Sequence, residues 1–256
     1  MKISIGINGF KPYDELLDRE RFCIDSLIKL VHLNDNITLY NICYEHEDVH
    51  YDGFETIFTI GDNTHLPHVN SMIETLALTE CDQLLFMNND IIVSQGLMDV
   101  FDDEHESYAI SRVHLRSMTS LDELLDMQSY SVHGFDAFGF RRDWFLTNKD
   151  IFPDAYIGKA YWDVLYFVKC ITKSKCKIVN KLPPVIFHIE HQSTSCKNVD
   201  KYLKFNEQQT LKEPDMHLWW SYVQNVLLKR HSYNDILWYM PFENEEILEK
   251  EYFNIV

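Results

Sequence analysis

The stretch CDQLLFMNNDIIVS, residues 81–94, decides the fold. Its first half, Leu84 to Met87, is apolar at every position, which is typical of a strand buried on both faces of a parallel sheet. Three polar residues, Asn88, Asn89 and Asp90, follow directly and separate this run from a second apolar one. Polar side chains at the end of a core strand lie where α/β proteins bind their ligands.

The first hundred residues alternate between short β-rich runs and helical spacing. Strands are predicted at 2–8, 37–44, 54–60 and 83–87, and helices at 20–33 and 68–80. This order predicts an α/β domain with a mostly parallel, doubly wound sheet flanked by helices. Asn8, Glu45 and the Asn88–Asp90 triplet each follow a predicted strand, so we expect them to meet at one edge of the sheet.

The rest of the chain is less regular. A short helix is predicted at 121–127, a strand within 133–145, a helix at 160–169, and two short strands around a Pro-Pro break within 175–191. From residue 200 onward helical spacing dominates, with an apolar stripe of Leu218, Trp219, Tyr222, Val223, Val226 and Leu227. We therefore predict a domain at 1–199 and a helical, aromatic-rich extension at 200–256 packed on it.

Composition limits the partners. The formal net charge of −17 opposes nucleic acid or an anionic membrane as the main ligand. No apolar run approaches a signal peptide or a membrane span, and the six cysteines include no CxxC pair, so a cytoplasmic protein with reduced thiols is predicted. Five lysines within residues 169–181 suggest either a small-anion site or, as the favoured interpretation, a solvated edge strand.

The Asn88–Asp90 triplet has two interpretations. A carboxylate at the end of a strand suits a divalent cation, since Mg²⁺ and Mn²⁺ prefer oxygen ligands and take few of them from protein. The two amides could then bond sugar hydroxyls without adding charge. Taken alone, however, the triplet favours an Asx turn, which Asn and Asp adopt for backbone reasons.

The order of the segments along the chain shifts the preference from the Asx turn toward the cation site. Residues 64–94, THLPHVNSMIETLALTECDQLLFMNNDIIVS, resemble the donor-binding segment of nucleotide-sugar glycosyltransferases with the GT-A fold. In that family a helix leads into an apolar strand that ends in a DxD motif, and the family 2 branch of rhamnosyl- and galactosyltransferases often has Asn-Asn-Asp there. FGFRRDWF at 138–145 and the segment 160–195, beginning AYWDV, continue the resemblance, which covers residues 2–195.

This resemblance implies a glycosyltransferase that moves a sugar from a UDP- or GDP-type donor to a hydroxyl of a glycan or other acceptor. Asp90 matches the DxD carboxylate that binds Mn²⁺ or Mg²⁺, and His188 matches a late His that completes the metal site, with His191 as the alternative. Asp163, in the family's Trp-Asp motif, matches the catalytic base of inverting enzymes, although retention of configuration stays open.

The resemblance also assigns donor contacts. The residues matched to donor binding are Asn8, Glu45 (with Asp48 as a substitute), Asn70, Asn88, Asn89 and Asp136. The Arg that precedes the matched Asn70 in the family is absent here, and this leaves the sugar undetermined.

Two other functions stay open. A nucleotidyltransferase would need a Gly-rich phosphate loop after the first strand, where this chain has only Gly6 and Gly9. A catalytically inactive scaffold would keep the fold without the chemistry. The C-terminal extension has three candidate roles: capping the acceptor site, burying a homodimer interface, or resting on a lipid-linked acceptor, of which its acidity most disfavours the last.

Overall fold

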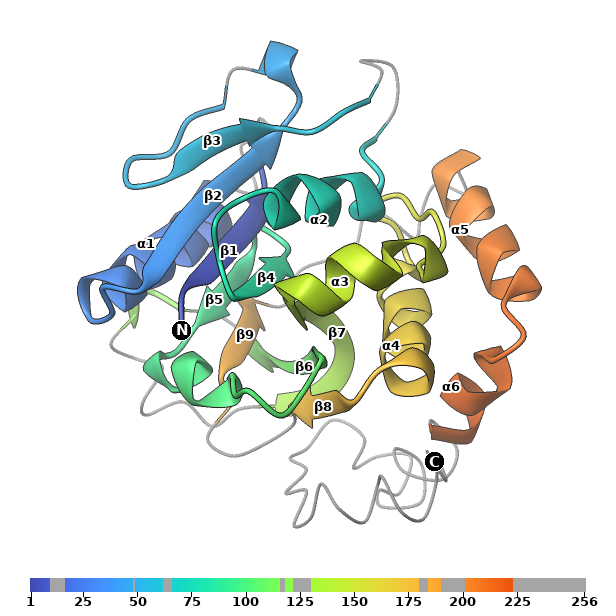
Figure 1. Cartoon of the computed structure of the whole chain (residues 1–256). Helices are drawn as coiled ribbons and strands as arrows, with labels where there is room; N and C mark the ends of the chain where they lie inside the picture. Colours follow the sequence, from blue (N-terminus) through green and yellow to red (C-terminus); the bar gives the residue numbers. More distant parts are fainter. Residues whose placement is uncertain are drawn as a thin grey trace.

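The structure is a computed structural model, which describes residues 1–9, 17–47, 49–61, 66–115, 118–121, 130–179, 184–189 and 201–222 (Figure 1). Its strands and helices follow in the order β1 (Ile3–Asn8), α1 (Leu17–His32), β2 (Ile37–Cys43), β3 (Glu55–Phe58), α2 (Val69–Ala77), β4 (Gln83–Met87), β5 (Ile91–Val93), β6 (Ser107–Leu115), β7 (Tyr130–Arg141), α3 (Arg142–Asn148), α4 (Trp162–Lys173), β8 (Cys176–Val179), β9 (Ile186–Ile189), α5 (Lys201–Lys212) and α6 (Met216–Tyr222). Short 3-10 turns lie at Glu45–Glu47, Gln95–Val100 and Lys149–Ile151.

The described strands form one sheet in the order β3-β2-β1-β4-β7-β6-β9-β5, with β8 also paired to β6. The first four strands in this order, β3, β2, β1 and β4, run parallel to one another, and β7 lies antiparallel between β4 and β6. Within the part of the chain described, five of the eight strand pairings are parallel. The prediction of an α/β fold with a mostly parallel sheet flanked by helices is confirmed.

Strand β4 is buried on both faces, as its apolar run predicts. Leu84 and Phe86 belong to the core beneath α2, α3 and α4, whereas Leu85 and Met87 belong to the core beneath α1 (Figure 1). Successive side chains of a strand point to opposite faces, so a strand between two helical layers must be apolar at every position.

Two elements were not predicted. The long strand β6 lies in the middle of the sheet, and α3 follows β7 directly. The second apolar run, 91–93, does not continue β4. A turn in which the Ile91 N–H donates to the Asn88 carbonyl at 3.3 Å redirects the chain after β4. The run forms β5, which pairs antiparallel with β9 at the edge of the sheet opposite β3. The helix predicted at 121–127 lies almost wholly outside the described residues.

The C-terminal helices α5 and α6 stand beside α4 (Figure 1). Met216, Leu218 and Trp219 pack against the core under α4, and the ring centroids of Trp219 and Phe167 are 5.6 Å apart. Leu218 and Trp219 of the predicted apolar stripe are therefore in contact with the rest of the protein. From Tyr222 onward, the members of the stripe lie outside the residues whose side chains the structure describes.

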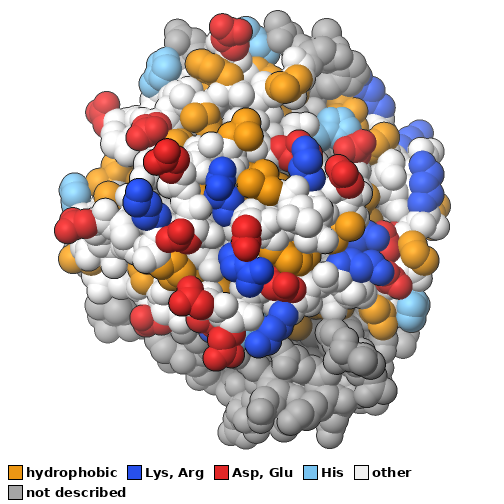
Figure 2. Space-filling view, viewed as in Figure 1, with side chains coloured by type: hydrophobic (Ala, Val, Ile, Leu, Met, Phe, Trp, Pro, Cys, Tyr) orange, Lys and Arg blue, Asp and Glu red, His pale blue; other side chains and the backbone are white. Residues whose placement is uncertain are grey.

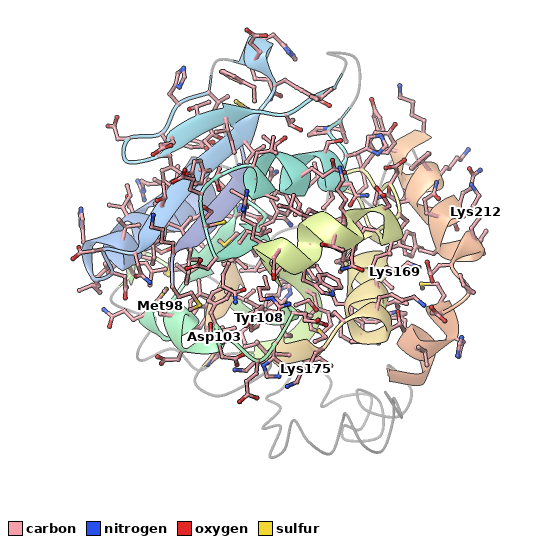
Figure 3. All side chains as sticks on the ribbon, in the orientation of Figure 1. Met98, Asp103, Tyr108, Lys169, Lys175 and Lys212 are labelled. Carbon is pink, nitrogen blue, oxygen red and sulfur yellow. The ribbon has the colours of Figure 1, made fainter. Side chains whose placement is uncertain are left out.

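The lysine cluster is neutralised by acids. Its ion pairs are Lys169–Glu213, Lys173–Asp215, Lys175–Glu104 and Lys177–Asp102, and Lys181 lies outside the described residues. Figure 3 labels Lys169 on α4 and Lys175 next to β8, and on the face shown in Figure 2 basic and acidic side chains are interspersed. The ion pairs disfavour an anion site. The interpretation as an edge strand holds for Lys177 on β8, whereas Lys169 and Lys173 belong to α4. Among the described helices, none has the length and apolarity needed to cross a bilayer.

Candidate functional site

The edge of the sheet predicted to bind ligands opens into a cavity of about 970 Å³, within the range of roughly 300–1,000 Å³ seen for small-molecule sites. The carboxyl ends of β4, β6 and β9 and the amino end of the antiparallel β7 meet there. The sheet and the start of α4 contribute Asn88, Asp90, Arg112, His114, Asp136, Asp163 and His188. The segment 158–162, α5 and α6 complete the lining.

Asp90 and His188 lie together although 98 residues separate them, with His188 Nε2 3.2 Å from Asp90 Oδ2. Strand β9 makes this contact because it runs between β5 and β6, where His188 is aligned with both Ile91 and His114. The His188 side chain is largely buried, and its ring centroid is 5.1 Å from that of His114. This pair is the one that the sequence predicted as a metal site.

A network of buried polar side chains fixes the turn that carries Asp90. The Asn89 N–H donates to Asn8 Oδ1 at 3.0 Å, and Asn89 Nδ2 donates to Glu20 Oε1 at 3.0 Å. The Tyr51 hydroxyl donates to the same Glu20 oxygen. Burial raises the pKa of the Glu20 carboxyl, and the bonds from Tyr51 and Asn89 oppose this effect. Asn8 and Asn89 are thus buried and bonded within the protein rather than lining the cavity.

Arg112 bonds to a second set of residues at the cavity, which includes Asp136 and His114. Its guanidinium forms an ion pair with the buried Asp136, and its Nε donates to His114 Nε2 at 2.9 Å, so this imidazole nitrogen carries no proton. Asn88 joins the same group, because its Nδ2 donates to Asp136 Oδ1 at 3.3 Å and its N–H donates to the Asp136 carbonyl at 3.3 Å. Asp136 therefore links the end of β4 to β6 and β7.

Asp163 lies in the first turn of α4, where the helix dipole favours a carboxylate. Burial raises its pKa, while the charge of Arg112 and bonds from backbone N–H groups oppose the shift. Gly134 lies beside both groups, since a Cβ there would be in van der Waals contact with Asp163 Oδ2 at 3.4 Å and Arg112 Cζ at 3.6 Å, and its φ of +85° is the feature that favours glycine. A carboxylate whose pKa is raised by burial, with a neighbouring cation that favours its ionised form, is suited to accept a proton.

The structure does not bring every predicted residue to the cavity. Asn70 is buried in the core, where Nδ2 donates to the Phe152 carbonyl at 2.8 Å and Oδ1 accepts the Tyr166 hydroxyl. Glu45 is exposed in the 3-10 turn after β2. Neither lines the cavity, and their donor-binding roles stay predictions. The substitutes Asp48 and His191 lie outside the described residues.

Arg112 and His114 are site residues that were not predicted, because β6 was not recognised. In its sequence SYAISRVHL, only the last four residues, Arg112 to Leu115, alternate between polar and apolar. This short period of two was the available signal. The strand turns polar toward its carboxyl end, as expected where a strand reaches a ligand site.

Asp90 and His188 fit a divalent cation that takes few ligands from protein. Within the described residues, no group of three or more His, Cys, Asp and Glu side chains is arranged to hold a metal. The pair offers one carboxylate and one imidazole at the cavity wall. Such a set suits Mg²⁺ or Mn²⁺, which leave their other positions to phosphate oxygens and water.

The sequence matches no protein-family model and no curated protein sequence. Among solved structures, it is similar to TarS of S. aureus, solved in complex with UDP-GlcNAc, at 10% identity over 91% of this chain and 77% of that chain, with a TM-score of 0.49. A putative nucleotide-diphospho-sugar transferase from Desulfovibrio desulfuricans G20 gives 9% identity over 85% and 98% of the two chains, with a TM-score of 0.48. The inositol-1-phosphate CTP transferase of T. maritima gives 12% identity over 82% and 96%, with a TM-score of 0.45. These neighbours include nucleotide-sugar and nucleotidyl transferases, and at TM-scores below 0.5 the likeness carries no argument about which activity this chain has.

Proposed function

We propose that the protein is a metal-dependent glycosyltransferase that moves a sugar from a nucleoside-diphosphate donor of the UDP or GDP type to an acceptor hydroxyl. The observation that supports this most is the convergence on one cavity of the Asp90–His188 pair and Asp163. The pair suits a cation that binds a diphosphate, and Asp163 is suited to act as a general base. Metal-dependent transfer by an inverting mechanism needs both at the same place.

In this proposal Asp163 takes the proton of the acceptor hydroxyl as its oxygen forms a bond to the anomeric carbon. The bond from that carbon to the diphosphate oxygen breaks, and the nucleoside diphosphate leaves with the electron pair. Attack from the face opposite the leaving group inverts the configuration. Arg112 supports the role of Asp163, because its charge opposes the rise in pKa that burial causes and so favours the ionised form of the base.

The charge around the cavity supports a requirement for metal. Its lining includes five carboxylates and two cations, namely Asp90, Asp136, Asp163, Glu207, Glu213, Arg112 and Lys159. Arg112 is already paired with Asp136, and Glu213 is paired with Lys169. An anionic diphosphate would meet repulsion from the carboxylates that remain. When bound by Asp90 and His188, a divalent cation would neutralise charge on the diphosphate.

The two glycines near the end of β1 weaken the nucleotidyltransferase alternative further. A Cβ on Gly6, within β1, would lie 2.7 Å from Ile42 Cδ1, and one on Gly9, directly after β1, would lie 1.7 Å from Asn41 Oδ1. Close packing within the protein therefore explains both glycines without a phosphate-binding loop.

Asp90→Ala tests the donor site. We expect calorimetry with a panel of UDP- and GDP-sugars and Mn²⁺ to show affinity at least about tenfold weaker than in the wild type, because one of two cation ligands is lost. The melting temperature should change little, since Asp90 is partly exposed at the cavity wall. Asp150→Ala, which removes an exposed carboxylate outside the cavity, is the matched control. An unchanged affinity in Asp90→Ala would refute the metal assignment.

Analysis of the reaction products distinguishes a glycosyltransferase from a nucleotidyltransferase and from an inactive scaffold. Release of UDP or GDP from a nucleotide sugar indicates glycosyl transfer or donor hydrolysis, whereas release of pyrophosphate from a nucleoside triphosphate and a sugar phosphate indicates nucleotidyl transfer. Metal-dependent binding without either product would favour the inactive scaffold.

Arg112→Gln tests the electrostatic coupling to the base. The base must be ionised, so kcat/KM should rise with pH through the pKa of Asp163. Removing the cation that lowers this pKa should move the acidic limb of the profile to higher pH. A limb that stays in place or moves to lower pH in this variant would mean that Arg112 does not set the ionisation of the base.

A further inference from the structure

The C-terminal helix α5 carries an unusual buried residue. Asn206 has no solvent-exposed surface, whereas Lys201, Lys204, Glu207 and Leu211 on the same helix are exposed. A polar side chain that is buried while its neighbours face solvent needs hydrogen-bond partners within the protein to replace its hydrogen bonds to water.

Those partners are backbone groups of the loop that leads into α4. Asn206 Oδ1 accepts the Tyr156 N–H at 2.8 Å, and Nδ2 donates to the Tyr156 carbonyl at 3.0 Å and to the Ala160 carbonyl at 3.2 Å. Both amide hydrogens and the carbonyl oxygen are thus used. The two bonded residues are four positions apart, so one side chain holds both ends of the loop segment 156–160.

The Tyr156 ring is held by the same helix. Its centroid lies 4.8 Å from that of Tyr202 and 5.0 Å from that of Phe205, both in edge-on contacts. Both aromatic residues precede Asn206 in the sequence of α5, Tyr202 by one helical turn and Phe205 directly. The helix therefore fixes the side chain as well as the backbone of Tyr156.

The loop needs to be fixed because it ends in a strained residue. Gly158 adopts φ +70° without strain, as glycine can, but Tyr161 has φ +81°, a left-handed conformation that is a genuine outlier for a bulky residue. Tyr161 precedes the first residue of α4, and its carbonyl accepts the first intrahelical bond, from the Leu165 N–H at 3.0 Å. Such a conformation persists only where surrounding contacts determine it, and it sets the direction in which α4 begins.

We infer that Asn206 is a positioning residue for Asp163. By bonding Tyr156 and Ala160, it holds the turn from which α4 presents the Asp163 carboxylate to the cavity, two residues after the strained Tyr161. The C-terminal helix is then part of the active site, since it orients the base in addition to lining the cavity. The assignment of a reaction to Asp163 rests on the proposed function, but the effect of Asn206 on the turn does not.

Asn206→Ala tests this inference with two measurements. Hydrogen exchange of the backbone amides at 157–164 should accelerate at least tenfold, because the side chain that holds the turn is gone. In the same variant kcat should fall at least tenfold while the KM for the nucleotide sugar changes less than about twofold, since the donor contacts are unaltered. The acidic limb of the pH profile should also shift, because the surroundings of Asp163 change.

Gln83→Ala is the matched control. Gln83 is another buried amide that donates to a backbone carbonyl, that of Asp102 at 3.0 Å, and it lies at the opposite end of β4. It should lower the melting temperature without altering kcat or exchange at 157–164. Should Asn206→Ala fail to fold, the isosteric Asn206→Asp keeps the bond from the Tyr156 N–H and loses the two donations, and the same changes are expected from it.

Unchanged exchange at 157–164 in a folded Asn206 variant would overturn the inference, as would accelerated exchange combined with an unchanged kcat in an active enzyme. If the wild-type protein turns over no nucleotide sugar, the proposed function fails, yet the exchange measurement still decides whether Asn206 holds the turn. The two failures are thereby distinguishable.

Discussion

Asp163→Asn is expected to reduce turnover by roughly two to four orders of magnitude, the usual scale for loss of a general base. The substitution preserves the size of the side chain and much of its hydrogen bonding, but asparagine cannot accept the acceptor's proton. Binding of the nucleotide sugar should stay near normal, because the Asp90–His188 pair is intact. Single-turnover kinetics and calorimetry on the same preparation measure the two quantities separately.

Asp154→Asn is a suitable control for this substitution, since Asp154 is exposed and does not line the cavity. It should leave both turnover and binding unchanged. If Asp163→Asn retains more than about a tenth of the wild-type rate while chemistry is rate-limiting, Asp163 is not the base. The cavity would then need another proton acceptor, or a retaining mechanism.

Truncation before Leu211 is expected to give an insoluble or strongly destabilised protein. It removes Met216, Leu218 and Trp219, which pack on the core under α4, and uncovers Phe167. Each large apolar side chain contributes about 1.5–3 kcal/mol when fully buried, so even partial burial of three is a large share of a total stability of roughly 5–15 kcal/mol.

The truncation also breaks a shielded ion pair. Lys169 and Glu213 are 2.7 Å apart, with side chains only 12% and 5% exposed, and removing one partner leaves the other charge poorly solvated. Leu211→Ala in the full-length chain is the control, because this side chain is 82% exposed and its loss should not change the melting temperature. A soluble truncated protein that melts like the wild type would make the extension a separable module.

Much of the fold was readable from local pattern. The β4 run is apolar at every position because helices cover both faces of the sheet, and the alternation of strands and helices in the first hundred residues is reproduced from β1 to β4. The central strand β6 was not recognised, because its pattern turns polar at Arg112 and His114, the residues that reach the cavity. The polar residues that obscured the strand in the sequence are thus the residues that it contributes to the site.

The sequence by itself determined which residues end the strands in polar groups, and the family resemblance singled out Asp90 and Asp163 as the carboxylates to consider for a cation and a proton. Only the tertiary structure decided which of these groups meet. It joined Asp90 to His188 across 98 residues, drew Asn70 into the core, and placed Asn206 against the turn before Asp163. The physical reason is that hydrophobic periodicity arises between neighbouring residues, whereas the composition of a site depends on strand order and on long-range packing, which a local pattern does not encode.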